Sequence, residues 1–155
     1  MNRSRLVRRL AAVIAVATGI ALVPFMAPAQ ASTTQIHFPK VFISVLRGAN
    51  EVDGGDPNGL AIAAAILDPN TGKLCYLLAE RNLQGDVTLA HIHQGAAGVN
   101  GPVVVQLAVP VHGFSHECIT IDPTLAESIV DNPRGFYFNI HTTAFKGGAV
   151  RGQLR

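Results

Sequence analysis

Short apolar runs rich in β-branched residues, separated by clusters of glycine, proline, asparagine and aspartate, follow one another through most of this chain. Runs of this length between turn-forming residues are typical of β-strands. The runs predict strands at residues 41–46, 60–67, 73–81, 87–93, 102–109, 136–141 and 149–154. Residues 118–121 are expected to be short and extended, and residues 110–117 irregular. The pattern favours an antiparallel sandwich or barrel.

One segment has the signals of a helix instead. Asp122 is placed as an N-cap, and Pro123 follows at the first helical position. Apolar residues then recur on one side, and the NPRG segment at residues 132–135 ends the helix. We therefore expect one all-β domain over residues 41–155. Its predicted fold is an antiparallel β-sandwich of Greek-key, immunoglobulin-like type with one short helix.

The N-terminal residues 1–31 are predicted to be a secretory signal peptide. Four arginines precede an apolar core at residues 10–23, and an A-x-A motif at residues 29–31 predicts cleavage before Ser32. The core of about 14 residues is short for a transmembrane helix, although an uncleaved anchor is the alternative. Residues 32–40 would then form a short lead of a secreted, extracytoplasmic protein, exported by the Sec or the Tat route.

The arginines of this predicted leader make the net charge of the whole chain positive. Cleavage would remove four of the 12 Lys and Arg residues and none of the 10 Asp and Glu residues, which leaves a net charge of −2. No cluster of lysine or arginine remains after cleavage. The sequence therefore gives no indication of a nucleic acid partner or of binding to an anionic membrane.

Cys75 and Cys118 are the two cysteines of the chain. An even number of cysteines in an exported protein favours a disulfide, with two free buried thiols as the alternative. A bridge between them would close a loop of about 44 residues and stabilise the fold by roughly 4 kcal/mol in the chain-entropy model.

Three histidines in strand-like runs form the candidate metal site. His91 and His93 are two residues apart, so on a strand they share one face with backbones about 7 Å apart. His141 lies in a third run, FYFNIHT. Three neutral imidazoles with an open position suit copper or zinc. The alternative is that these are core histidines bonded to the backbone.

Other residues are weaker candidates. His116, two residues before a cysteine, is a possible fourth ligand. Gly95, Gly98 and Gly101 are interpreted as residues that shape a tight loop through positive φ angles, with no ligand implied.

Glu51 and Arg151 form a second pair of interest, because each is a charged residue flanked by apolar positions. A structural ion pair is the first interpretation. The functional alternative places Arg151 beside the metal, where it would guide an anion inward.

The segments GANEV, LCY, AHIHQGAAGVNGPVVVQL and FYFNIHTTAFKGGAVRGQL, in this order, resemble the CHRD domain. This module is repeated in the developmental protein chordin and occurs singly in bacterial secreted proteins. The resemblance covers residues 41–155 and implies an exported β-sandwich; in chordin the domain belongs to an extracellular binder of growth factors. The chain departs from the common pattern in two loops, at residues 53–55 and 145–146.

The histidine pattern is also similar, more loosely, to the copper ligands of copper/zinc superoxide dismutase. No counterpart of that enzyme's zinc-binding loop is found, so copper is expected and zinc is less favoured. This leads to two hypotheses of different classes. One is a copper site at His91, His93 and His141, with superoxide dismutation as its enzymatic form. The other is an extracellular protein-binding or structural module in which the histidines are structural and residues 94–101 contact a partner.

Overall fold

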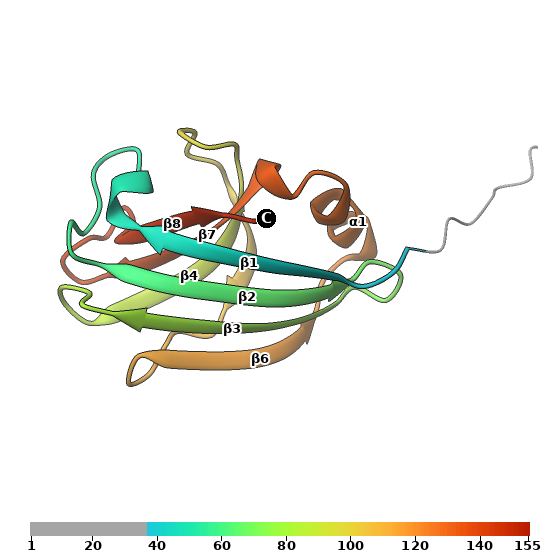
Figure 1. Ribbon diagram of the computed structural model, residues 1–155, viewed down its shortest axis with the longest axis horizontal. Helices are drawn as coiled ribbons and strands as arrows, with labels where there is room; N and C mark the ends of the chain where they lie inside the picture. Colours follow the sequence, from blue (N-terminus) through green and yellow to red (C-terminus); the bar gives the residue numbers. More distant parts are fainter. Residues whose placement is uncertain (1–36) are drawn as a thin grey trace, which may run out of the picture. The chain divides into compact units, whose positions relative to one another are not determined.

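The computed structural model describes residues 37–155, and the predicted signal peptide and most of the lead lie outside the described residues. Eight strands, one α-helix and two short 3-10 helices make up the fold (Figure 1). They are β1 (Lys40–Arg47), η1 (Gly48–Asn50), β2 (Leu60–Asp68), β3 (Lys73–Arg81), β4 (Val87–Gln94), β5 (Val103–Leu107), β6 (Phe114–Thr120), α1 (Pro123–Asp131), η2 (Pro133–Gly135), β7 (Phe136–Thr142) and β8 (Val150–Gln153).

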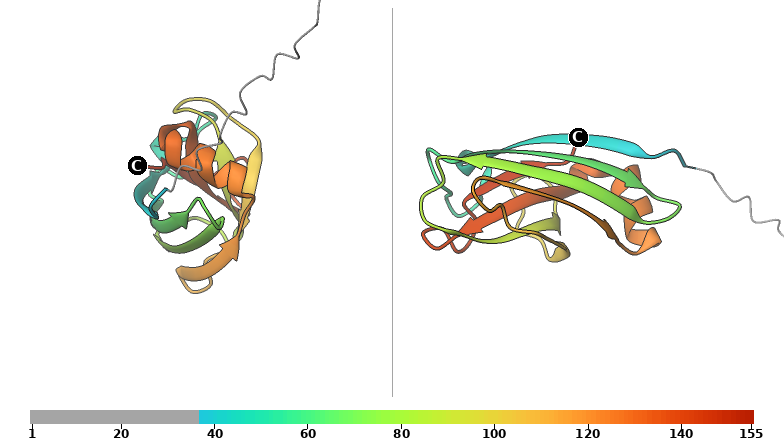
Figure 2. Two further views of the ribbon diagram at one scale, coloured as in Figure 1. Left: turned by 90° about the vertical axis from the view of Figure 1, so that its right-hand side faces the viewer. Right: turned by 90° about the horizontal axis from the view of Figure 1, so that it is seen from below.

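The strands form one antiparallel sheet with the order β5-β4-β7-β8-β1-β2-β3-β6. The sheet is curled into a half-barrel, so that a front layer of β1, β2, β3 and β6 faces a back layer of β5, β4, β7 and β8 (Figures 1 and 2). The two layers join where Arg47 of β1 pairs with Arg151 of β8. The all-β antiparallel class is confirmed. The described strands form one continuous sheet, so the sandwich and Greek-key details of the prediction are not confirmed.

The core fills the space inside the curled sheet. Side chains exposed by 2 % or less come from both layers, among them Phe42, Leu78, Ile92 and Phe138. The predicted helix is confirmed as α1, which adds buried apolar residues of its own to this core. Its start follows from the local sequence, because the Asp122 side chain accepts hydrogen bonds from two backbone N–H groups of the first turn.

Most predicted strands begin and end within two residues of the observed ones. The exception is β6. It begins at Phe114, inside the stretch predicted to be irregular. A two-residue turn precedes it, in which His112 and Gly113 have φ angles of 54° and 81°. Val111 and Phe114 close this turn with backbone hydrogen bonds in both directions. His-Gly is not among the usual hairpin dipeptides, which explains why the turn escaped detection.

Candidate metal centre

The outer face of the back layer carries polar residues that loops cover. Along β4 and β7, even-numbered residues such as Ile92 and Phe138 lie in the core. Odd-numbered residues therefore point to the opposite face. In the register of the two strands, His91 lies opposite Asn139, and His93 lies opposite Tyr137. All seven residues of β7 are buried, which shows that this outer face is covered as well.

The three predicted histidines meet on this face. His91, His93 and His141 are exposed by only 6 %, 8 % and 8 %. One nitrogen from each ring lies within 4.8 Å of the other two. The expectation that these three side chains converge is thus confirmed by their geometry.

Two backbone carbonyls decide which nitrogens are free. The Nδ1 atom of His93 lies 2.9 Å from the carbonyl oxygen of Gly101, and Nδ1 of His141 lies 3.0 Å from that of Lys146. A carbonyl only accepts hydrogen bonds, so each Nδ1 carries the proton and each Nε2 presents a lone pair. Both Nε2 atoms, together with Nδ1 of His91, are buried and lack a hydrogen-bond partner.

Three buried nitrogens without partners in one place need an explanation, because buried polar atoms are nearly always satisfied. A metal ion would supply that partner. Neutral ring nitrogens bind such ions at about 2.0–2.1 Å, and a carbonyl on the second ring nitrogen is the usual way to orient a ligand histidine. The residues therefore fit a metal ion with three histidine ligands.

Burial of the site favours the neutral form of two of the rings, His91 and His93. Burial is the largest cause that lowers the pKa of His91, to about 4, and the neighbouring His141 and His93 add to it. Burial also lowers the pKa of His93, although its hydrogen bond to Gly101 works against this. The lone pairs of both rings are therefore available at neutral pH, as metal binding requires.

Acid is expected to destabilise the metal-free protein. The ordinary pKa of His91 is 6.5 and its value in the fold is about 4, so the unfolded chain binds a proton that the folded chain excludes. The contribution of His91 to the free energy of unfolding should therefore be fully present above pH 6.5 and be lost as the pH drops towards 4. Urea denaturation at several pH values, with a chelator present, measures this.

The carboxyl group of Glu51 changes the pH dependence of stability in the opposite direction. Burial raises the pKa of Glu51 to about 7, so the fold retains a proton that the unfolded chain releases. A Glu51→Gln variant should then lose stability in acid more steeply than the parent protein. A His91→Ala/His93→Ala variant should give a flatter profile, and a steep acid loss in that variant would contradict the assignment to these two rings.

Arg151 holds the loop that supplies one of the carbonyls. Its side chain is exposed by 1 %, and its Nη2 atom donates to the backbone oxygens of Ala96 and Val99, at 2.8 Å and 2.7 Å. The guanidinium lies 3.4 Å from the ring centre of Tyr137, which in turn stacks on His93 with ring centres 4.8 Å apart. Arg151, Tyr137 and His93 thus form one stack against the loop at residues 95–101.

This placement differs from the first interpretation of the Glu51 and Arg151 pair, a structural ion pair. No ion pair within 4.0 Å joins them among the described residues. The arginine still lowers the carboxyl pKa of Glu51 through space, but less than burial raises it. The guidance of an anion by Arg151 stays a prediction, and the burial of its guanidinium speaks against it.

The glycine loop is shaped by close contacts more than by unusual φ angles. Gly98 has a φ of 79°, as predicted. Gly95 and Gly101 do not have positive φ angles; instead, a Cβ atom on Gly101 would lie 1.6 Å from the backbone oxygen of Gln94. The explanation offered for these two glycines from the sequence is therefore corrected.

His116 does not join the other histidines. It lies on β6 of the front layer, opposite Leu77 of β3. Its side chain is exposed beside Phe114, with ring centres 5.5 Å apart. The reason is the layer on which it lies. His116 faces outward from the front layer, whereas the three clustered histidines lie on the outer face of the back layer.

Sequence reasoning missed Tyr137 and the two anchoring carbonyls. The position of Tyr137 could have been predicted, because Tyr137 and His141 are four residues apart on one strand and therefore share a face. The carbonyls of Gly101 and Lys146 belong to loops, whose paths strand periodicity does not predict.

Comparison with protein families identifies the family to which this chain is similar. A model described as the CHRD domain matches residues 42–154. No curated protein and no solved structure matches the chain. The described residues contain no helix long and apolar enough to cross a membrane.

Proposed function

The chain belongs to the CHRD domain family, and from that premise we propose that it is an extracytoplasmic protein that binds copper through His91, His93 and His141. The observation that carries this proposal is the set of three buried, unpartnered ring nitrogens within 4.8 Å of one another. The Cys75–Cys118 disulfide supports an oxidising compartment, and the proposed signal peptide at residues 1–31 would provide export.

Copper is preferred over zinc on the chemistry of the ligands. The group contains imidazoles alone, with no thiolate or carboxylate among its members. Imidazole suits both metals, but divalent copper binds nitrogen ligands more tightly than zinc. Zinc is therefore the competitor that a binding experiment must include.

Dismutation of superoxide is the enzymatic form of this proposal. Bound copper would supply one-electron chemistry, in which two superoxide ions and two protons give one dioxygen and one hydrogen peroxide. The protein contributes two ligands, His91 and His93, whose pKa values burial lowers, and carbonyls of Gly101 and Lys146 that fix two of the rings. A hollow lined by Glu51, Asp53 and Lys146 lies next to these loops. Of these, Lys146 would attract an anion, whereas the carboxyl groups of Glu51 and Asp53, when ionised, would repel one.

Metal analysis tests the proposal directly. We expect about one copper per chain in protein expressed from the complete chain and purified without chelator or histidine tag. A His91→Ala/His93→Ala/His141→Ala variant should contain none, whereas His116→Ala, which alters an exposed histidine, should keep it. Competition with equimolar zinc then decides the metal. If neither parent nor variant binds copper or zinc, and neither metal raises the unfolding midpoint, the proposal is wrong.

A superoxide assay follows only for protein that holds copper. Dismutation by the parent protein, lost in the triple variant and retained by His116→Ala, would support the enzymatic form. Copper binding without dismutation would leave a metal-binding protein that is not a dismutase.

An extracellular binding module is the second candidate. The structure offers one observation in its favour, because the outer face of the front layer exposes several large apolar side chains, and such patches mark interaction sites. This face lies on the layer opposite the histidines and is separate from the loop at residues 94–101. The two candidates therefore concern different surfaces and do not exclude each other.

A further inference from the structure

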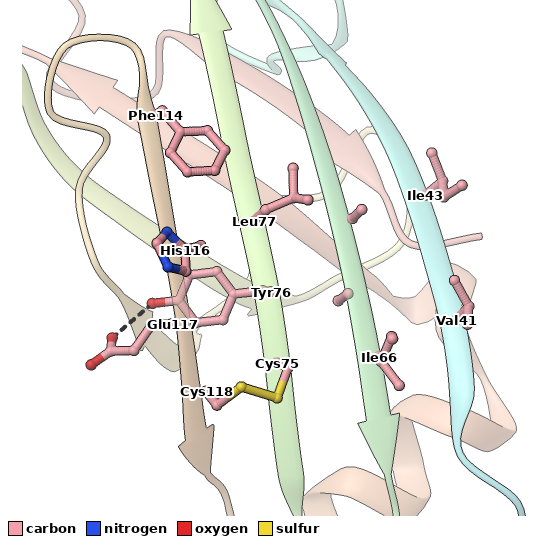
Figure 3. A pocket seen from close by; sticks show the side chains of 12 residues that line it. Val41, Ile43, Ile66, Cys75, Tyr76, Leu77, Phe114, His116, Glu117 and Cys118 are labelled. Carbon is pink, nitrogen blue, oxygen red and sulfur yellow. Dashed lines mark hydrogen bonds between the residues drawn. A yellow bond between two sulfur atoms is a disulfide. The ribbon is translucent and has the colours of Figure 1, made fainter.

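An apolar face on the outside of the front layer has no role in the metal centre. Figure 3 shows side chains from β1, β2, β3 and β6 gathered on this face. They line a hollow of about 580 Å³. Large hydrophobic side chains on it are exposed by 37–60 %. They are Val41, Ile43, Ile62, Ile66, Leu77 and Phe114.

The register of the four strands arranges this face in three cross-strand rows. The first row contains Val41, Ile66, Cys75 and Cys118; the second contains Ile43, Ala64, Leu77 and His116; the third contains Val45, Ile62, Ala79 and Phe114. His116 is the one member with an ionisable side chain, because the two cysteines are joined in a disulfide. We call these twelve positions the apolar face.

The same strands are apolar on their inner side as well. Phe42, Ala65 and Leu78 alternate with members of the apolar face and lie in the core. Strands that are apolar on both sides are typical of a sheet covered on both sides. The described fold covers the inner side alone, so the apolar face needs a partner to complete the pattern.

We propose that the apolar face packs against the same face of a second copy of this chain. The twelve positions of the apolar face carry no permanent charge, and Glu117 of the edge strand β6 is the one carboxylate that lines the hollow, so the face gives a charged partner little to recognise. It suits another apolar sheet face, packed at about 10 Å as in a sandwich. A two-fold axis would bring two copies of one face together, since such interfaces are self-complementary.

The size of the face is consistent with a dimer. Its six large side chains expose on the order of 500 Å² of apolar surface, which is in the upper part of the range for the largest patch on a monomer. It is more than half of the about 800 Å² that each partner contributes to a stable interface. The smaller members of the three rows and the rim would supply the remainder. A dimer of this kind leaves the loops over the histidines exposed, because they cover the opposite layer.

The test is the mass of the protein in solution. We expect sedimentation equilibrium of protein expressed from the complete chain to give twice the chain mass at micromolar concentration. Ile43→Lys and Ile66→Lys each place a charge within the face and should weaken the dimer on the order of 100-fold or more. Val103→Lys is the matched control, because Val103 is a strand residue of similar exposure, 47 %, on the other layer. It should remain dimeric.

The outcomes separate clearly. A monomer at all concentrations would overturn the proposal and leave the face to a different macromolecule. A dimer that survives both lysine substitutions would overturn it too, since the copies would then meet elsewhere. If the lysine variants fail to fold, Ile43→Thr/Ile66→Thr keeps the strand preference and should still weaken the dimer. Metal binding plays no part in this test, so it stands apart from the proposed function.

Discussion

Replacement of Arg151 by methionine is expected to lower the free energy of unfolding by about 3 kcal/mol. The guanidinium donates to the backbone oxygens of Ala96 and Val99 and lies against the ring of Tyr137. Methionine fills much of the same volume but donates nothing. The oxygen of Val99 would then lose its charged donor inside the protein, while that of Ala96 keeps a bond from a backbone N–H.

The same change should weaken metal binding. The loop that Arg151 holds carries the Gly101 carbonyl, and this carbonyl fixes the ring of His93. Loss of a group that orients a ligand typically costs 10- to 100-fold in metal affinity. Copper titration of the Arg151→Met variant at neutral pH measures this effect. The loss of stability is expected whether or not the protein binds copper, so the two results can be judged separately.

Two further variants calibrate the effect. Arg151→Lys keeps the charge but loses the planar group that reaches two carbonyls and stacks on Tyr137, so it should recover less than half of the stability. Arg81→Met alters an exposed arginine at the end of β3 and should change stability by less than about 0.5 kcal/mol. Urea denaturation followed by circular dichroism measures all three. Equal stability of Arg151→Met and the parent would show that the stack is not structural.

Strand periodicity explains why the ligands could be predicted. His91 and His93 share a face because they are two residues apart, and His141 lies on a strand whose alternation is equally regular. Their convergence needed only that β4 and β7 be neighbours, as the register shows. Sequence could also indicate the cysteine pair, because the chain has no other cysteine.

The periodicity of the sequence does not predict the paths of loops or which strands pair with each other. Which carbonyl meets His141 depends on the path of the loop at residues 143–149, and strand periodicity does not predict that path. The position of Arg151 relative to Glu51 likewise depends on how β8 joins the two layers. The apolar face is a third feature that periodicity does not place. Strands that are apolar on both sides predict a sheet that is covered on both sides. Which side the fold itself covers depends on the direction in which the sheet curls.

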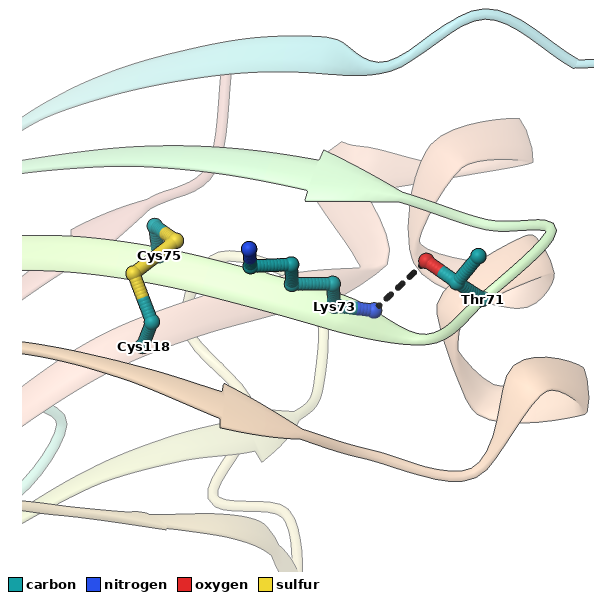
Figure 4. The surroundings of a disulfide bond; sticks show 4 residues. All are labelled: Thr71, Lys73, Cys75 and Cys118. Atoms are coloured by element: carbon teal, nitrogen blue, oxygen red, sulfur yellow. Dashed lines mark hydrogen bonds between the residues drawn. A yellow bond between two sulfur atoms is a disulfide. The ribbon is translucent and has the colours of Figure 1, made fainter.

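Removal of the disulfide is expected to lower the free energy of unfolding by about 4 kcal/mol. Cys75 and Cys118 face each other directly in the register of β3 and β6, and 43 residues separate them in sequence (Figure 4). The closed loop includes β4 and β5, so the bridge restricts a large part of the unfolded chain. In the folded protein β6 pairs with β3 alone, at one edge of the sheet.

The Cys75→Ala/Cys118→Ala variant is the appropriate test, because alanine keeps this part of the apolar face apolar. Its urea midpoint should fall, and a reductant should shift the parent protein by a similar amount while leaving the variant unchanged. Protein concentrations must be matched, because a dimer through the apolar face would add stability that depends on concentration. A change below about 1 kcal/mol would mean that the bridge restricts the unfolded chain little, and that pairing with β3 alone holds the edge strand.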